Sequence, residues 1–209
     1  AHYGYADSIR YEPLGPPPTP LVLDNFDDCN DTNSLGGFWW TYDDVALGGT
    51  SRVTPAGEER MAAAPGRQGA GCALGVTYAF GAATESWYPR AGMGCNFGKI
   101  SGVARAVDFS SVQRVTFRAK GSTSNFYISL ISDLDPEVQA EARFEGLSDT
   151  AWTQYTVDLA GDVIGEGPGH LPWSVVRRYI SRITARTLDK DNRGGGGEIL
   201  LDDIEIHFD

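Results

Sequence analysis

Val115-Thr116-Phe117-Arg118-Ala119 alternates apolar and polar side chains, and this pattern decides the fold class. In an extended strand, Val115, Phe117 and Ala119 point to one face, while the two polar residues between them point to the other. The same period of two recurs outward along the chain, with apolar members Phe126, Ile128 and Leu130, then Tyr155, Val157 and Leu159, then Ile183 and Ala185. Turn residues, among them 26 Gly and 11 Pro, separate these runs. Short alternating strands divided by turns predict an all-β protein, an antiparallel two-sheet β-sandwich of the jelly-roll type.

Residues 1–20 differ from the rest and predict an extended N-terminal arm, followed by one sandwich domain over residues 21–209. The arm ends in Pro16-Pro17-Pro18-Thr19-Pro20, a stiff and extended linker. Before the linker, apolar residues fall on odd positions, the pattern of a strand with one apolar face; they are Tyr3, Tyr5, Ile9 and Tyr11. Because such an arm can add a strand to another sheet, we expect it to dock on a neighbouring copy of the chain.

Charge and hydropathy exclude two classes of partner. The 209 residues include 17 Lys and Arg against 28 Asp and Glu, a formal net charge of −11. This surface repels phosphate backbones, so nucleic acid is not an expected partner. The longest apolar runs, such as Leu21-Val22-Leu23, fall far short of a membrane span. The chain begins at Ala1 rather than Met, as expected of a mature protein exported to the extracellular space or cell surface.

The three cysteines, Cys29, Cys72 and Cys95, have no CxxC spacing. In an exported chain they predict one disulfide and one odd thiol. Cys72 and Cys95 each open a strand-like run, so a hairpin would bring them together, and we expect this pair to form the disulfide. Cys29–Cys95 is the alternative.

Asp202 indicates a metal site, because it shares its parity in the last strand with Leu200, Ile204 and Ile206. A carboxylate on a buried face is costly unless a cation, backbone amides or an arginine neutralises it. Asp27 and Asp28 follow the first strand of the sandwich. If the terminal strands lie together, these carboxylates form an oxygen-rich site, and we expect a structural Ca²⁺ held by Asp27, Asp28 and Asp202.

Several short motifs resemble the galactose-binding-like jelly-roll carbohydrate-binding modules, most closely those of family 11. The resemblance covers roughly residues 21–208 and rests on Leu23-Asp24-Asn25-Phe26-Asp27, Gly71-Cys72-Ala73-Leu74-Gly75-Val76, Val107-Asp108-Phe109, Val115-Thr116-Phe117-Arg118-Ala119-Lys120, Trp152-Thr153-Gln154-Tyr155-Thr156-Val157 and Leu201-Asp202-Asp203-Ile204-Glu205-Ile206. It implies a calcium-stabilised, non-catalytic domain that binds β-glucan through a concave face of aromatic and polar side chains.

On such a face we expect Tyr127, Arg143 and Arg186, because each has the opposite parity to the apolar residues of its strand. Arg186 has the alternative role of pairing with a carboxylate. Trp40 and Trp87 lie in aromatic-rich segments and are further candidates for stacking on sugar rings. For Trp40 the alternative is structural, with Trp39 and Trp40 divided between core and surface.

Enzyme signatures are absent from the sequence. It holds no GxSxG motif, and its three histidines are dispersed in a tail, a loop and the last strand. Two adjacent acids, Asp43 and Asp44, are more typical of a solvated loop than of a glycosidase pair. Two functions therefore remain: a non-catalytic extracellular domain that binds polysaccharide, β-glucan above all, or a structural subunit of an extracellular filament or surface assembly of identical copies.

Overall fold

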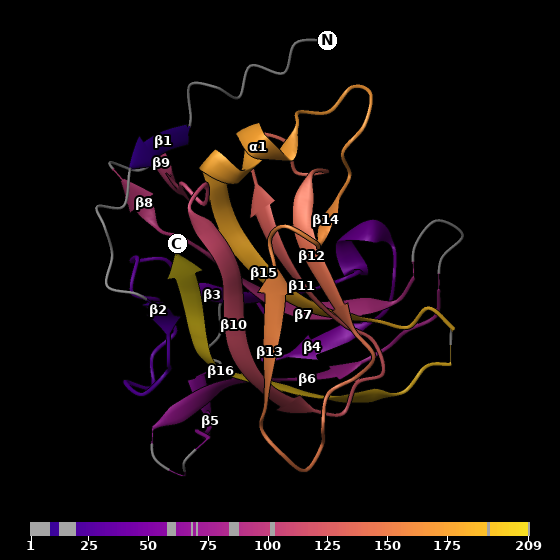
Figure 1. Ribbon diagram of the computed structural model, residues 1–209. Helices are drawn as coiled ribbons and strands as arrows, with labels where there is room; N and C mark the ends of the chain where they lie inside the picture. The colour runs from indigo at the N-terminus through magenta and orange to yellow at the C-terminus, as the bar shows by residue number, and fades with distance from the viewer. Residues whose placement is uncertain are drawn as a thin grey trace.

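The computed structural model describes residues 9–12, 20–57, 62–67, 69, 71–83, 88–100, 103–191 and 193–208. Within them, two β-sheets stack face to face (Figure 1). The first, called the β11 sheet below, runs in the order β1 (Ile9–Glu12), β9 (Val103–Val107), β15 (Ile180–Leu188), β11 (Phe126–Ser132), β12 (Gln139–Phe144) and β14 (Val163–Ile164). It also contains β3 (Trp39–Asp43), β7 (Arg90–Asn96) and β8 (Lys99–Ile100), with β7 joining β15 to β3.

The second sheet, called the β16 sheet, runs in the order β13 (Thr153–Asp158), β10 (Val112–Gly121), β16 (Gly196–Phe208), β6 (Cys72–Ala79) and β4 (Arg52–Thr54), with β2 (Leu21–Asp24) on β16 and β5 (Ala62–Pro65) on β6. Helical structure among the described residues is limited to the single turns η2 (Val45–Leu47), α1 (Trp173–Val176) and η3 (Arg177–Tyr179). None of these described helices is long and apolar enough to cross a membrane. The expected two-sheet β-sandwich is confirmed.

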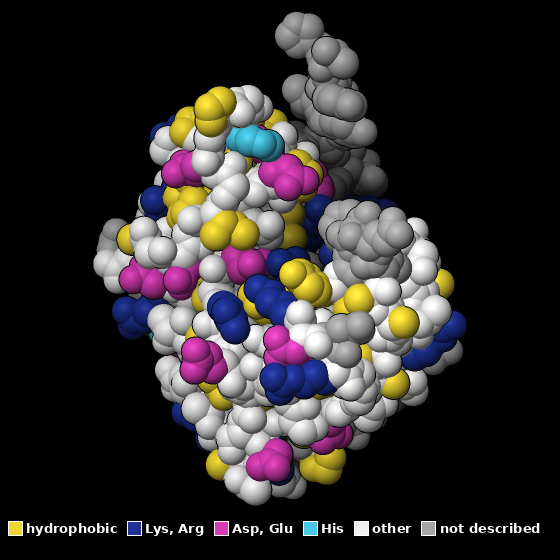
Figure 2. All heavy atoms as spheres, turned by 90° about the vertical axis from the view of Figure 1, so that its right-hand side faces the viewer, with side chains coloured by type: hydrophobic (Ala, Val, Ile, Leu, Met, Phe, Trp, Pro, Cys, Tyr) yellow, Lys and Arg dark blue, Asp and Glu magenta, His cyan; other side chains and the backbone are white. Residues whose placement is uncertain are grey.

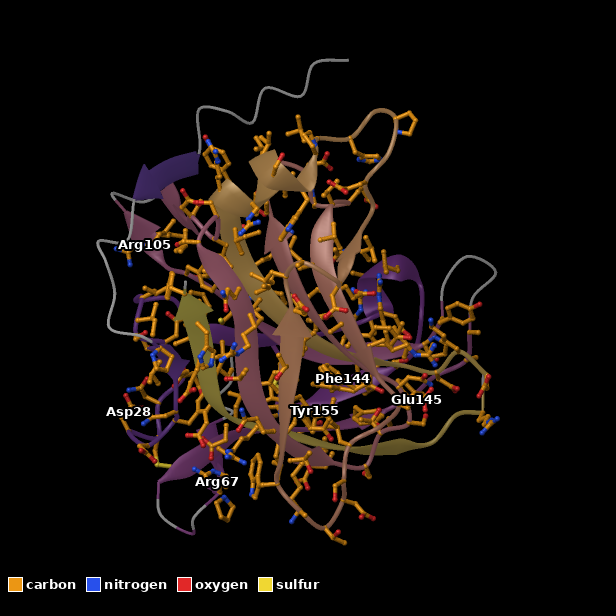
Figure 3. The ribbon with its side chains drawn as sticks, in the orientation of Figure 1. Asp28, Arg67, Arg105, Phe144, Glu145 and Tyr155 are labelled. Carbon is orange, nitrogen blue, oxygen red and sulfur yellow. A yellow bond between two sulfur atoms is a disulfide. The ribbon has the colours of Figure 1, made fainter. Side chains whose placement is uncertain are left out.

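The core lies between the sheets, as the alternation of apolar and polar residues along the strands predicts. Phe126, Ile128 and Leu130 of β11 face Val115 and Phe117 of β10, and all five are almost fully buried. The two sheets also meet at their edges, where the rings of Phe144 (β12) and Tyr155 (β13) pack edge to face with centroids 4.9 Å apart (Figure 3). Because Phe126, Ile128 and Leu130 point inward, the alternate residues of β11 point away from the core.

A β-bulge in β16 changes the predicted environment of Asp202. Asp203 has a φ of +46°, and the pairing of β16 with β10 shifts register between Asp202 and Glu205. Before the bulge Ile199 and Leu201 enter the core, and after it Ile204 and Ile206 do. The expectation that Asp202 shares a core-facing side with Ile204 is therefore wrong, because the extra residue reverses the parity. Asp202 is still buried, with 4% of its surface exposed, but outside the apolar cluster.

The disulfide joins Cys29 to Cys72, with their Cα atoms 5.1 Å apart. The expected pair of Cys72 and Cys95 is wrong, as is the alternative of Cys29 and Cys95. Cys72 opens β6 in the β16 sheet, whereas Cys95 lies in β7 of the β11 sheet, so the two strands are not a hairpin. Cys95 is a buried free thiol in the core, and burial raises its pKa.

The N-terminal arm, where it is described, pairs with its own chain. Ile9–Glu12 forms β1, which lies parallel to β9 in register Ile9 with Ala104 through Glu12 with Val107 (Figure 1). Tyr3 and Tyr5 fall outside the described residues, as do the side chains of Ile9 and Tyr11. Residues 9–12 therefore lie on an edge of their own sheet, which is against the expected docking of the arm on a neighbouring copy, and that docking stays a prediction.

Candidate functional site

The outward side of the β11 sheet carries two rows of aligned residues. Strand pairing across β12, β11, β15, β7 and β3 fixes both rows. The first row contains Arg143, Tyr127, Arg186, Gly92 and Tyr42, and the second contains Glu141, Ser129, Thr184, Gly94 and Trp40. We call this surface the platform. It comprises these two rows and three residues of the next row, Gln139, Ile131 and Arg182. The four interstrand spacings give it a width of about 19 Å at about 4.8 Å each.

Two glycines of β7 make room for two aromatic rings of β3. A Cβ atom at Gly94 would lie 3.0 Å from the Trp40 ring, and one at Gly92 would lie 2.9 Å from the Tyr42 ring. The two rings therefore lie over the bare backbone of β7 rather than standing beside it. Their centroids are 5.4 Å apart with planes inclined by 51°. The result is a pair of half-buried aromatic surfaces at one end of the platform.

The middle of the platform is built around the ion pair of Arg186 and Glu141. Arg186 Nη2 donates to Glu141 Oε2, and Ser129 Oγ donates to the same oxygen at 2.8 Å. The Arg186 guanidinium also lies over the Tyr127 ring, 5.6 Å from its centroid. Lys190 approaches the same ring to 5.2 Å. Held by a carboxylate and an aromatic ring, Arg186 keeps a fixed position on the surface.

Several polar atoms of the platform lack a hydrogen-bond partner among the described residues. They are Tyr127 OH, Gln139 Oε1, Arg182 Nε and Arg186 Nε. Beside them is a hollow of about 300 Å³, whose lining includes Trp40, Tyr42, Ile131, Thr184 and Arg186. Buried polar groups in folded proteins are nearly always hydrogen-bonded. Arg182 and Arg186 line the hollow, so two of these unpaired donors belong to residues beside a space in which a polar ligand would fit.

Tyr42 remains a neutral phenol on this surface. Burial raises the pKa of its hydroxyl, while the nearby Arg186 opposes the shift. At neutral pH the hydroxyl therefore keeps its proton and remains able to donate or accept a hydrogen bond.

The sequence predictions for this surface have mixed outcomes. Tyr127, Arg143 and Arg186 share one row on the outward face, as their parity indicated. Tyr127, however, is only 3% exposed and lies under two cationic side chains, so it is not an open stacking surface. Arg143 is exposed, and its Nη2 donates to Asn125 Oδ1 at 2.8 Å. Arg186 pairs with Glu141, so the alternative of a carboxylate partner is confirmed, whereas its role in ligand binding stays a prediction.

The two adjacent tryptophans divide as the structural alternative proposed. Trp39 is 2% exposed in the core, whereas Trp40 is half-buried on the platform and lines the hollow. Trp87 lies outside the described residues. The sequence reasoning missed Tyr42, Glu141 and the two glycines. The sequence contained one indication of this arrangement. Gly92 and Gly94 occupy alternate positions of β7, so the outward face of this strand has no side chains at these two positions.

The three expected calcium ligands lie apart from the platform, near the start of the sandwich. Asp202 accepts hydrogen bonds from the backbone N–H of Arg67 at 3.0 Å and of Asp203 at 2.9 Å. Asp27 and Asp28 accept from the side chains of Asn25 and Asn30. Figure 3 labels Asp28 and Arg67 in this part of the molecule. The described residues contain no group of three acidic, His or Cys side chains placed to hold a metal. These hydrogen bonds occupy only part of each carboxylate, and calcium binding stays a prediction.

Asp43 and Asp44 have structural roles in the turn after β3. Asp44 is 3% exposed and accepts from Ser51 N at 2.9 Å, Ser51 Oγ at 2.6 Å and Arg90 N at 3.1 Å. The expectation that both acids are solvated is therefore wrong for Asp44. Asp43 accepts from the backbone N–H of Val45 at 3.0 Å. Each carboxylate is occupied in shaping the loop that borders the hollow.

Comparison with known proteins places this fold. No family model and no curated protein matches the chain. Among solved structures it is similar to the family 11 carbohydrate-binding module of the cellulosomal cellulase Lic26A-Cel5E of Clostridium thermocellum, with a TM-score of 0.55 and 16% identity over 91% of this chain and 95% of that one.

It is also similar to a family 11 module from Clostridium thermocellum in complex with a β-1,3-1,4-mixed-linked tetrasaccharide, with a TM-score of 0.50 and 14% identity over 91% of this chain and 96% of that one. At these identities the similarity establishes the fold. The chain has the jelly-roll fold of the family 11 carbohydrate-binding modules, as its motifs predicted.

Proposed function

We propose that this chain is a non-catalytic domain that binds polysaccharide on the platform. The observation that carries the proposal is that the Trp40 and Tyr42 rings, which lie over β7, line the same hollow as two arginines with unpaired Nε atoms, Arg182 and Arg186. Sugar rings offer apolar C–H faces for stacking and hydroxyl groups at their edges. An aromatic surface beside fixed donors and acceptors matches both features.

The platform also has the dimensions of a chain-binding surface. A width of about 19 Å across the strands accommodates several consecutive sugar residues rather than one. The hollow beside Trp40 is open to solvent at one end of this path, since Val45 and Leu47 of the bordering η2 turn are 45% and 38% exposed. We infer that a polysaccharide lies across β12, β11, β15, β7 and β3, with one ring on Trp40.

The first ligand to test is β-glucan. The sequence resemblance implies it, and a solved structure with the same fold contains a β-1,3-1,4-mixed-linked tetrasaccharide. Binding of such a polymer fits an extracellular location, which the disulfide also favours. We therefore also propose that the protein is secreted and that its polysaccharide partner lies outside the cell.

Electrophoresis through gels that contain polysaccharide tests this function. Trp40→Ala removes the stacking surface and is expected to weaken retention at least tenfold, while Trp40→Phe keeps part of it. Val22→Ala, an exposed apolar change on β2 of the opposite sheet, is the control and should migrate like the wild-type protein. If the wild-type protein is not retarded by any neutral or acidic polysaccharide, the proposed function is wrong.

A further inference from the structure

The platform is basic although the whole chain is acidic. Against a formal net charge of −11, the hollow is lined by Arg90, Arg182 and Arg186 and by a single acidic residue, Asp43. Figure 2 shows Lys and Arg side chains gathered near the middle of one face, beside hydrophobic side chains and with acidic ones around them. A concentration of positive charge that opposes the net charge of the protein needs a local explanation.

More positive charge lies across Tyr127 from the hollow. Arg143 is exposed and has a neutral partner, the amide oxygen of Asn125. Lys190 is also exposed, and its ammonium group lies over the Tyr127 ring. No ion pair joins either side chain to a carboxylate among the described residues. Arg143 and Lys190 are therefore able to form ion pairs with an anionic ligand.

The carboxylates on the platform do not neutralise this charge. Glu141 pairs with Arg186, and Asp133 pairs with Arg182 at 3.3 Å. Arg186 still keeps Nε without an acceptor, and 21% of its side chain is exposed. After these pairs are formed, Arg143 and Lys190 leave the surface with net positive charge.

A neutral sugar polymer would cover these cations without replacing their hydration. Removing a charged group from water costs free energy unless an opposite charge or good hydrogen bonds compensate. A carboxylate or sulfate group provides that compensation, because a guanidinium donates parallel hydrogen bonds to two of its oxygens. The charges on the platform therefore favour a ligand with anionic groups over the neutral β-glucan that the resemblance implies.

We propose that the platform recognises an acidic polysaccharide, whose carboxylate or sulfate groups pair with Arg143, Arg186 and Lys190 while a sugar ring stacks on Trp40. This proposal rests on the function proposed above and specifies its ligand class. The remaining surface of the protein repels polyanions, so retention on such a polymer would report the platform rather than general ionic attraction.

Matched polymers provide the test. The affinity of the full chain is measured for polygalacturonate, for the same polymer after reduction of its carboxyl groups, for a sulfated galactan and for neutral mixed-linkage β-glucan. We expect an acidic polymer to bind at least tenfold more tightly than the neutral ones, and to lose affinity as salt rises from 50 to 500 mM. Preference for the uronate or for the sulfated polymer identifies the anionic group.

Two variants connect this preference to the platform. The double variant Arg143→Gln with Lys190→Gln is expected to lower affinity for the preferred acidic polymer at least tenfold. Arg114→Gln removes one exposed positive charge from β10 of the opposite sheet, and its affinity should equal that of the wild-type protein. Thermal melting checks that each variant is folded. Equal affinity for polygalacturonate and its reduced form, without preference for the sulfated polymer, overturns the inference and leaves glycan binding intact.

Discussion

Replacing Asp24 by Asn is expected to change how stability depends on pH. Asp24 ends β2 and is 7% exposed. Its carboxylate accepts from Trp39 Nε1 at 2.9 Å and from the backbone N–H of Phe26 at 3.0 Å. Burial nevertheless raises the pKa of this carboxyl from 3.8 to about 6, against the opposing effect of these two hydrogen bonds. The group thus links the start of the sandwich to β3, the strand that carries Trp40.

The sign of the effect follows from the direction of this shift. Because the folded protein binds the Asp24 proton more tightly than the unfolded chain, the group contributes stability below pH 3.8 that is lost as pH rises through 6. A shift of about two pKa units corresponds to about 3 kcal/mol, most of it between pH 4 and pH 7. Asn does not titrate, so Asp24→Asn should gain stability relative to the wild-type protein over this interval.

Urea unfolding at a series of pH values, followed by tryptophan fluorescence, measures the difference. The difference between the two proteins isolates Asp24 from the other carboxylates, whose contributions are common to both. Asn keeps a single acceptor oxygen, so the variant also loses one of the two hydrogen bonds at every pH. A difference in unfolding free energy that stays constant from pH 4 to pH 7 would refute the reasoning.

Two further predictions concern the same end of the sandwich. Changing both Cys29 and Cys72 to Ser opens a loop with a sequence separation of 43. The chain-entropy model predicts that the free energy of unfolding, measured with urea, falls by about 4 kcal/mol. As an internal control, the variant and the reduced wild-type protein should have equal stability. A calcium ion held by Asp27, Asp28 and Asp202 should raise the melting temperature, because it would bind only the folded protein. It would also offset the repulsion from Asp203 and Asp27, which adds to the burial that raises the pKa of Asp202. A melting temperature that is the same in excess calcium and in chelator excludes that site.

The parts of the fold that depend on local alternation could be predicted from the sequence. Phe117 and Ile128 enter the core and Arg143 and Arg186 leave it because a strand alternates its side chains whatever its neighbours are. The disulfide could not be predicted, since it depends on which sheets the strands of Cys72 and Cys95 join and on where the loop that carries Cys29 lies. The bulge at Asp203 was also invisible, because one inserted residue reverses parity without a change in composition.

The candidate site shows the same division. Parity alone indicated Tyr127, Arg143 and Arg186, but only the register across β7 shows that Trp40 and Glu141 share a row. Nor does parity reveal that Tyr127 is covered, because Lys190 comes from the turn after β15 rather than from a neighbour on its own strand. Which residues face outward is a local property, whereas which of them remain accessible depends on tertiary contacts.

The order of strands under the platform has a consequence for folding. Its rows combine β3, β7, β11, β12 and β15, which begin at residues 39, 90, 126, 139 and 180. No short fragment of the chain therefore contains the site, and the rows align only after contacts distant in sequence have formed. Sheets assembled from such contacts fold slowly compared with proteins whose contacts are local. During refolding, polysaccharide binding would consequently recover later than the strand content. Its rate of recovery would report the last step in the assembly of the two sheets.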